Sequence, residues 1–167
     1  MQTSFKAVTA AMATLVVLGS ATLQAQTNNA SISATAVVQQ PINVTGAVNM
    51  AFGNVFPGVT KAIALTDAGA GRFDVTGQSA AAANLSFTLP TTLVSGANTL
   101  PIGSWTGEWN GANSPTGGTN FTPAAALTPV TFSPTGTLFV FVGATVTPAT
   151  TQPAGTYTGS VQMTVTY

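Results

Sequence analysis

The C-terminal segment, residues 155–167, alternates between apolar and polar residues almost to its last position. Successive side chains of an extended chain point to opposite faces, so this period of two predicts a half-buried β-strand. We expect the free edge of this terminal strand to be paired by an earlier strand or by another chain. Its apolar face carries Tyr157, Val161, Met163, Val165 and Tyr167, and the opposite face carries threonine, serine and glutamine.

The segment 29–40 near the N-terminus has the same alternating pattern. Its apolar residues Ile32, Ala34, Ala36 and Val38 fall on one face, and small polar residues occupy most of the other. Pro41 follows directly and ends the strand or marks a sheet edge, because proline has no N–H to donate to a ladder. The two most regular strands are therefore predicted at the two ends of the folded chain.

Shorter strands are predicted between these two segments. Residues 137–143 are apolar on both faces, which indicates a central strand covered on each side. The glycine-containing turn 67–71 joins the candidate strands 59–66 and 72–76, and this arrangement predicts a hairpin. Further strands are predicted at 44–48, 84–89 and 99–102.

Residues 103–125 are rich in Gly, Asn, Thr and Pro, and we interpret most of them as one long loop with a short strand at 105–109. No stretch after residue 25 has sustained helical periodicity. Short strands at this spacing, separated by turn residues, predict an all-β fold in the form of a β-sandwich.

Residues 1–25 have the pattern of a secretory signal peptide. Lys6 provides a basic start, residues 10–18 form an apolar run too short to span a membrane, and small residues lead to a cleavage point after Ala25. The mature chain, residues 26–167, is then long enough for a single domain with its own core.

Composition narrows the classes of protein that remain. The chain has no cysteine, so an exported form of it has no disulfide and depends on packing and backbone pairing. Only 4% of residues are charged, and without Lys6 the net charge is −1, which excludes a basic nucleic-acid footprint. Such low charge offers little repulsion between copies and favours repeated self-association.

The sequence offers little for catalysis. It has no histidine and no cysteine, which excludes histidine-based triads, thiol nucleophiles and the usual zinc ligands. Asp67, Asp74 and Glu108 are the carboxylates, and their spacing supports neither a calcium site nor a glycosidase pair, so we expect no enzyme, metal or cofactor.

A sugar is the one small-molecule ligand that the sequence suggests. Trp105 and Trp109, with Glu108 and Asn110 nearby, offer aromatic faces beside hydrogen-bonding groups. The same tryptophans could instead close the end of the core beneath a loop, which is the more ordinary role of such residues.

Two short stretches carry a family resemblance. Residues 50–58 read MAFGNVFPG, and residues 154–159 read AGTYTG just before the terminal alternating run. With the N-terminal alternating segment, this order resembles the bacterial DUF4402 domain family, whose function is unknown. It is more distantly similar to the spore coat protein U domain and to subunits of archaic chaperone–usher pili.

The resemblance implies an incomplete immunoglobulin-like β-sandwich whose missing strand comes from another subunit. A periplasmic chaperone would supply that strand first, and an outer-membrane usher would then assemble the subunits at the cell surface. Residues 26–40 would be the donor strand or the first strand. The implied donor residues are Ile32, Ala34, Ala36 and Val38, and the implied acceptor groove contains Tyr157, Val161, Met163, Val165 and Tyr167.

Three functions therefore remain open. The first is a secreted structural subunit of a pilus-like fibre, whose partners are other copies of itself. The second is a self-complete sandwich on the cell surface, closed by its own N-terminal strand, that binds a partner or a glycan through residues 103–125. The third, a small outer-membrane barrel, is favoured least because prolines interrupt the candidate strands.

Overall fold

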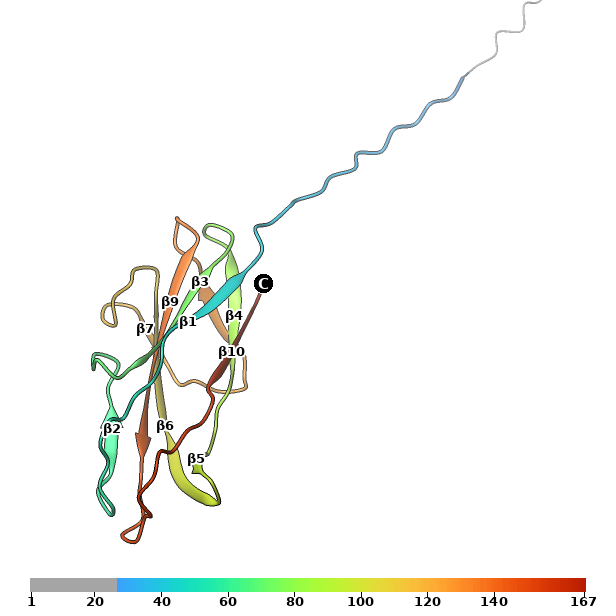
Figure 1. The fold of residues 1–167 in the computed structure, drawn as a ribbon. Helices are drawn as coiled ribbons and strands as arrows, with labels where there is room; N and C mark the ends of the chain where they lie inside the picture. Colours follow the sequence, from blue (N-terminus) through green and yellow to red (C-terminus); the bar gives the residue numbers. More distant parts are fainter. Residues whose placement is uncertain (1–26) are drawn as a thin grey trace, which may run out of the picture. The chain divides into compact units, whose positions relative to one another are not determined.

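The computed structural model describes residues 27–167, so the predicted signal peptide and cleavage point lie outside the described residues. Residues 27–42 contain no strand or helix, and the side chains of residues 27–41 are exposed. The folded domain lies within Val37–Tyr167 and is all β (Figure 1). The described residues form no helix and hence offer none that could cross a membrane.

The strands pair antiparallel throughout and form two sheets. The alternation of small, β-branched and aromatic residues along the chain suits such strands, and turns rich in glycine and proline separate them. In chain order they are β1 (Asn43–Val48), β2 (Lys61–Ile63), β3 (Gly71–Thr76), β4 (Ala82–Thr88), β5 (Thr92–Ser95), β6 (Asn98–Asn110), β7 (Thr119–Phe121), β8 (Thr128–Thr131), β9 (Thr137–Val146) and β10 (Gln162–Thr166).

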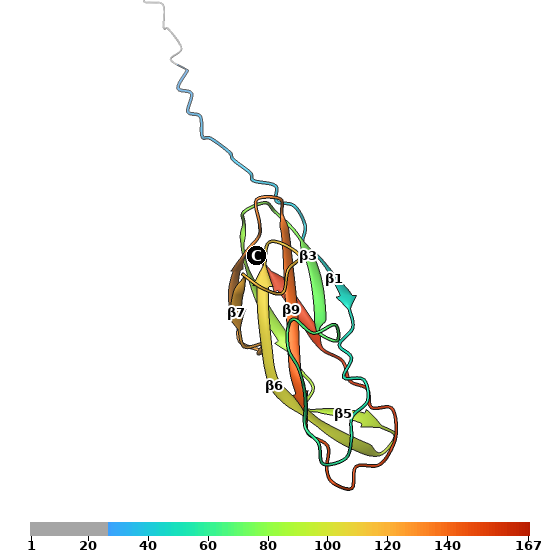
Figure 2. The same cartoon turned by 90° about the vertical axis from the view of Figure 1, so that its left-hand side faces the viewer.

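The larger sheet has the strand order β1-β3-β9-β6-β5, and Figure 2 shows β3, β9 and β6 side by side. β2 pairs with the end of β9, and β7 pairs with the end of β6. The smaller sheet has the order β10-β4-β8. The chain passes from one sheet to the other several times, for example between β3 and β4 and between β4 and β5.

The core lies between the sheets and falls into two clusters. The first combines residues of both sheets, including Leu85 from β4 and Leu138 and Val140 from β9. The second is smaller and contains Leu100, Ile102, Ala144 and Val146. Alternate residues of β9 point into these clusters, as expected for the central strand predicted at 137–143.

The predicted hairpin between 59–66 and 72–76 is wrong. β2 pairs with β9, and both edges of β3 are occupied by β1 and β9. The connection folds into local turns instead, because the Asp67 carboxylate accepts the Ala64 N–H at 2.9 Å and the Asp67 carbonyl accepts the Ala70 N–H at 2.9 Å.

The strand predicted at 105–109 is confirmed as part of β6, which continues to Asn110, and the predicted loop 103–125 is therefore shorter than expected and also contains β7. The small residues that suggest a loop have other uses in β6. A bulge between Gly103 and Thr106 shifts the register, and Ser104 adopts a positive φ of 47° there. Gly107 leaves room for the Phe121 ring, which a Cβ atom would meet at 2.6 Å. The irregular parts are 111–118 and 122–127.

The predicted strands at 44–48 and 84–89 are confirmed as β1 and β4, and 99–102 is part of β6. The terminal strand is shorter than predicted, since β10 begins at Gln162 and residue Thr158 forms only an isolated bridge to Val94. Its alternation is confirmed, with Met163 buried between exposed Gln162 and Thr164.

The domain has two ends, which we name the Tyr167 end and the Phe56 end. The Tyr167 end contains the start of β1 at Asn43, the end of β3 at Thr76 and the C-terminus. β9 runs from this end to the Phe56 end, where the turn 56–59 meets the loop after β9 through the Gly58 N–H and the Ala149 carbonyl, 3.0 Å apart. Figure 1 shows β2 and β5 far from the C-terminus.

Candidate functional site

Two edge strands of the domain each have one free edge. β1 pairs with β3 alone, and β10 pairs with β4 alone, among the residues that the structure describes. An unpaired edge presents a row of N–H and C=O groups that can pair with another strand. The strand predicted from residues 155–167 therefore ends the smaller sheet, and its second edge has no neighbour within the described chain.

The inner side of β1 is uncovered. Val44 lies opposite Val75 of β3, and Val75 is 1% exposed whereas Val44 is 37% exposed. Two residues along, a Cβ atom added at Gly46 would meet no atom within 4 Å. A strand that faced a complete core would not leave such space beside an inward position. The side of the domain next to β1 is thus an open seam between the sheets.

A cavity of about 710 Å³ continues this seam toward the Phe56 end. One wall is the stretch that follows β1, with Met50, Phe52 and Val55. The other wall is the stretch 153–161 that precedes β10, and Leu100 and Ile102 of the smaller core cluster lie between the walls. The cavity is therefore largely apolar and borders the core.

The five predicted groove residues take three different places. Tyr157 and Val161 line the cavity, and Met163 and Val165 face the larger core cluster beneath β10. The Tyr157 hydroxyl is held by Gln152, whose Nε2 donates to it at 2.7 Å, and it donates to the Pro153 carbonyl at 2.8 Å. These bonds fix one wall of the cavity.

Tyr167 lies at the end of the domain, away from the cavity. Its ring packs near Phe132, with centroids 6.2 Å apart. Its hydroxyl accepts the Gln78 N–H at 2.7 Å and donates to the Gln40 carbonyl at 2.6 Å. The C-terminal residue thus ties down the chain just before β1.

The predicted donor residues Ile32, Ala34, Ala36 and Val38 are all exposed and belong to no strand. Ile32 and Val38 are each 94% exposed, which is unusual for large aliphatic side chains in an alternating segment. No residue of 27–41 contributes to either core cluster. The segment that the pattern marks as a strand therefore has no strand partner within the described chain.

The structure separates the residues of the suggested sugar site. Trp105 and Trp109 pack against the core from the inner face of β6. Glu108, which alternates with them, is buried on the other face, where its Oε1 accepts the Gly118 N–H at 2.8 Å. Asn110 holds the same loop, since its Nδ2 donates to the carbonyls of Ser114 and Thr116 at 3.2 Å. The tryptophan faces and the polar groups do not converge on one ligand.

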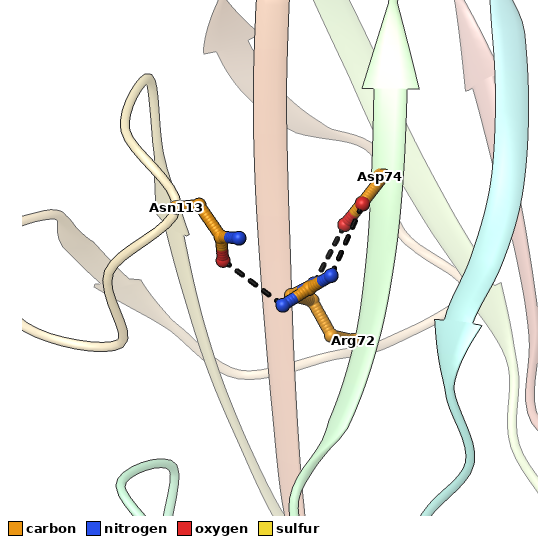
Figure 3. Close-up of polar contacts among 3 residues, drawn as sticks. All are labelled: Arg72, Asp74 and Asn113. Carbon is orange, nitrogen blue, oxygen red and sulfur yellow. Dashed lines mark hydrogen bonds and ion pairs between the residues drawn. The ribbon is translucent and has the colours of Figure 1, made fainter.

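The carboxylates of β3 and its preceding turn also have local partners. Arg72 forms an ion pair with Asp74, with Nε 2.7 Å from Oδ1, and its Nη1 donates to Asn113 Oδ1 at 3.0 Å (Figure 3). Asp67 caps its own turn, as described above. The described residues contain no group of three or more histidine, cysteine or acidic side chains that could hold a metal ion.

The amino-acid sequence gives no sign of one wall of the cavity or of the open position beside it. Met50, Phe52 and Val55 belong to the family-like stretch 50–58, and their spacing has no regular period that would mark them as inward-facing. Gly46 carried no signal, because a glycine within a strand does not reveal whether a neighbour covers it. No protein-family model matches the chain, and no curated protein matches it.

Proposed function

We propose that this chain is an exported structural subunit of a surface fibre, in which residues 29–40 of one copy add a strand to the open seam of another. One observation carries the proposal: an uncovered apolar seam and an unpaired apolar-alternating segment occur in the same chain. The proposed fold is an immunoglobulin-like sandwich that lacks one strand. The low charge of the chain is compatible with repeated self-association.

The free edge of β10 would supply main-chain hydrogen bonds to the incoming strand, and this mode of recognition is a general one for sheet edges. Ile32 and Val38 would enter the seam and contribute up to ~1.5–3 kcal/mol each if fully buried. Ala34 and Ala36 contribute less, so the backbone ladder has the larger share in binding. The small alanines suit positions where the sheets approach each other closely.

Export is proposed from the predicted signal peptide, and the assembly partners are proposed from the resemblance alone. The predicted signal peptide directs the chain out of the cytoplasm. A periplasmic chaperone would protect the seam before assembly, because an exposed apolar edge strand promotes aggregation. An outer-membrane usher would then exchange the chaperone for the next subunit at the cell surface.

The test uses a variant that begins at Gln40, which keeps the bond to Tyr167 but lacks the donor segment. We expect this variant to remain monomeric and to be stabilised against urea by a synthetic peptide of residues 29–40, because a ligand of the folded state raises its stability. The mature chain should form heat-resistant assemblies. The matched control is the same peptide with Ile32→Asp and Val38→Asp, which should not stabilise the variant.

A mature chain that is a stable monomer would contradict the proposal, as would a truncated variant that ignores the peptide. The self-complete surface sandwich would then be the better description. Binding of a partner would in that case be sought at the loop 111–118.

A further inference from the structure

A small apolar patch lies at the Phe56 end of the domain. Phe56 is 67% exposed and Val59 is 57% exposed, and Pro57 lies between them. The patch is rigid, because the Val59 N–H donates to the Phe56 carbonyl at 3.1 Å and the Gly58 N–H donates to the Ala149 carbonyl. Large apolar side chains held out from a fixed turn are typical of a contact surface.

The patch is continuous with the seam. Phe56 and Pro57 line the cavity of the seam as well as the end of the domain. Any strand that occupies the seam over its full length therefore ends beside this patch.

The direction of a strand added to the seam decides which of its two ends lies beside the patch. β10 runs toward the Tyr167 end, and every pair of strands in the described chain is antiparallel. A strand added antiparallel to β10 runs the other way, so its C-terminal end leaves the seam at the Phe56 end. At ~3.3 Å per residue, residues 29–40 span roughly 40 Å, which is more than the length of β9 at roughly 33 Å.

The donor chain has no slack after its inserted segment. The Gln40 carbonyl is bonded to Tyr167 of its own domain, and the Gln40 N–H donates to the Gln78 side chain at 3.2 Å. Pro41 and Ile42 alone separate Gln40 from β1. The Tyr167 end of the donor domain must therefore lie directly against the Phe56 end of the acceptor.

We infer that the patch formed by Phe56, Pro57 and Val59 is a second contact between copies of this chain, packed against the Tyr167 end of the copy whose segment fills the seam. The inference rests on the proposed function. It adds a domain-to-domain interface to the strand, and this interface would fix the angle between successive subunits.

The test compares a peptide donor with a whole-chain donor. The variant Val59→Ser weakens the patch at a residue that does not line the cavity, and Leu127→Ser is the matched control because Leu127 is 65% exposed and precedes β8, on the side of β4 away from β10. In the variant that begins at Gln40, we expect Val59→Ser to change affinity for peptide 29–40 by less than about threefold, because Val59 does not line the cavity. In the mature chain, the substitution should weaken association between copies about tenfold or more, as expected when a large apolar side chain loses its burial.

Fluorescence anisotropy of a labelled peptide measures the first quantity, and light scattering during dilution measures the second. Thermal unfolding of the truncated variants checks that each still folds. If Val59→Ser assembles like the Leu127→Ser control while the peptide still binds, the inference is overturned and the patch serves a partner other than a second copy. If the unmodified truncated domain does not bind the peptide, the proposed function fails and the inference fails with it.

Discussion

The chain has two segments with the same alternating pattern, and only one of them is paired. In the C-terminal segment, Met163 is 7% exposed and lies opposite Phe87 of β4. In the N-terminal segment, Ile32 is 94% exposed and has no strand beside it. Alternation fixes which side chains share a face, but burial requires a neighbouring strand to supply the other half of the contact.

The two segments also differ in what they leave unsatisfied. β10 is paired along one edge only, so the N–H and C=O groups on its other edge face no strand of the described chain. Residues 29–40 have no ladder on either side. A strand placed between β1 and β10 would satisfy an edge of β10 and cover Val44, so each segment lacks what the other can provide.

The largest expected effect is the difference in stability between two truncations to alanine, one in each segment. Met163→Ala should lower the free energy of unfolding of the domain by about 2–5 kcal/mol, because it removes a buried side chain and leaves a cavity. Ile32→Ala should change it by less than about 0.5 kcal/mol, because the residue is exposed. Urea unfolding of the chain under conditions where it is monomeric measures both values.

An appreciable loss of monomer stability in Ile32→Ala would show that the N-terminal segment packs on its own domain. The contrast can be sharpened in the assembled state. There, Ile32→Ala should lower the temperature at which assemblies dissociate, whereas in the monomer it should not alter the unfolding midpoint.

The same contrast explains how much the sequence can predict. Alternation correctly predicted β4 and β10, and the doubly apolar run predicted β9 as a central strand, because burial on one face or two leaves a direct trace in residue type. The pairing of strands leaves no such trace. The turn 67–71 looked like a hairpin, yet β3 had better partners in β1 and β9.

β6 was underestimated for a related physical reason. Its glycines at 103 and 107 and its serine at 104 suggest a loop, but each accommodates a bulge or a close aromatic neighbour within a sheet. For the candidate site, the pattern suggested residues on both sides of the proposed contact, and their pairing stays a prediction. The pattern did not identify the cavity wall after β1, since that wall is formed by irregular backbone without a period.

A second prediction applies the contrast to glycines. Gly143 lies in central β9, where an added Cβ would collide with the Ile63 carbonyl and would meet Thr106 Oγ1 at 2.7 Å. Gly143→Ala should therefore destabilise the domain by about 1–3 kcal/mol. Gly46→Ala meets open space and should change stability by no more than about 0.5 kcal/mol.

Thermal or urea unfolding of the two variants distinguishes these expectations. A destabilised Gly46→Ala monomer would mean that the seam is occupied in the isolated chain. Gly46→Val extends the test, because its larger side chain should leave the monomer stable while it reduces binding of peptide 29–40.

A smaller loss of stability than in Met163→Ala or Gly143→Ala is expected at the point where the two segments meet. Tyr167→Phe removes the hydroxyl that joins the Gln78 N–H to the Gln40 carbonyl but keeps the ring against Phe132. Each such bond contributes about 0.5–1.5 kcal/mol, and partial exposure of Tyr167 places the loss near the lower end, at about 1 kcal/mol in total. Hydrogen exchange at the Gln78 amide should accelerate, because that N–H loses its acceptor.

The bond from the Tyr167 hydroxyl to Gln40 lies at the base of the N-terminal segment, so its loss should also affect how assembled domains are oriented. Without it, the chain between Gln40 and β1 gains freedom, so successive domains in an assembly should become less uniformly oriented while peptide capture by the truncated domain stays the same. Electron microscopy of assemblies would detect this as greater curvature. If curvature and Gln78 exchange are both unchanged, Tyr167 does not hold the base of the N-terminal segment, and the close contact inferred between domain ends loses its main support.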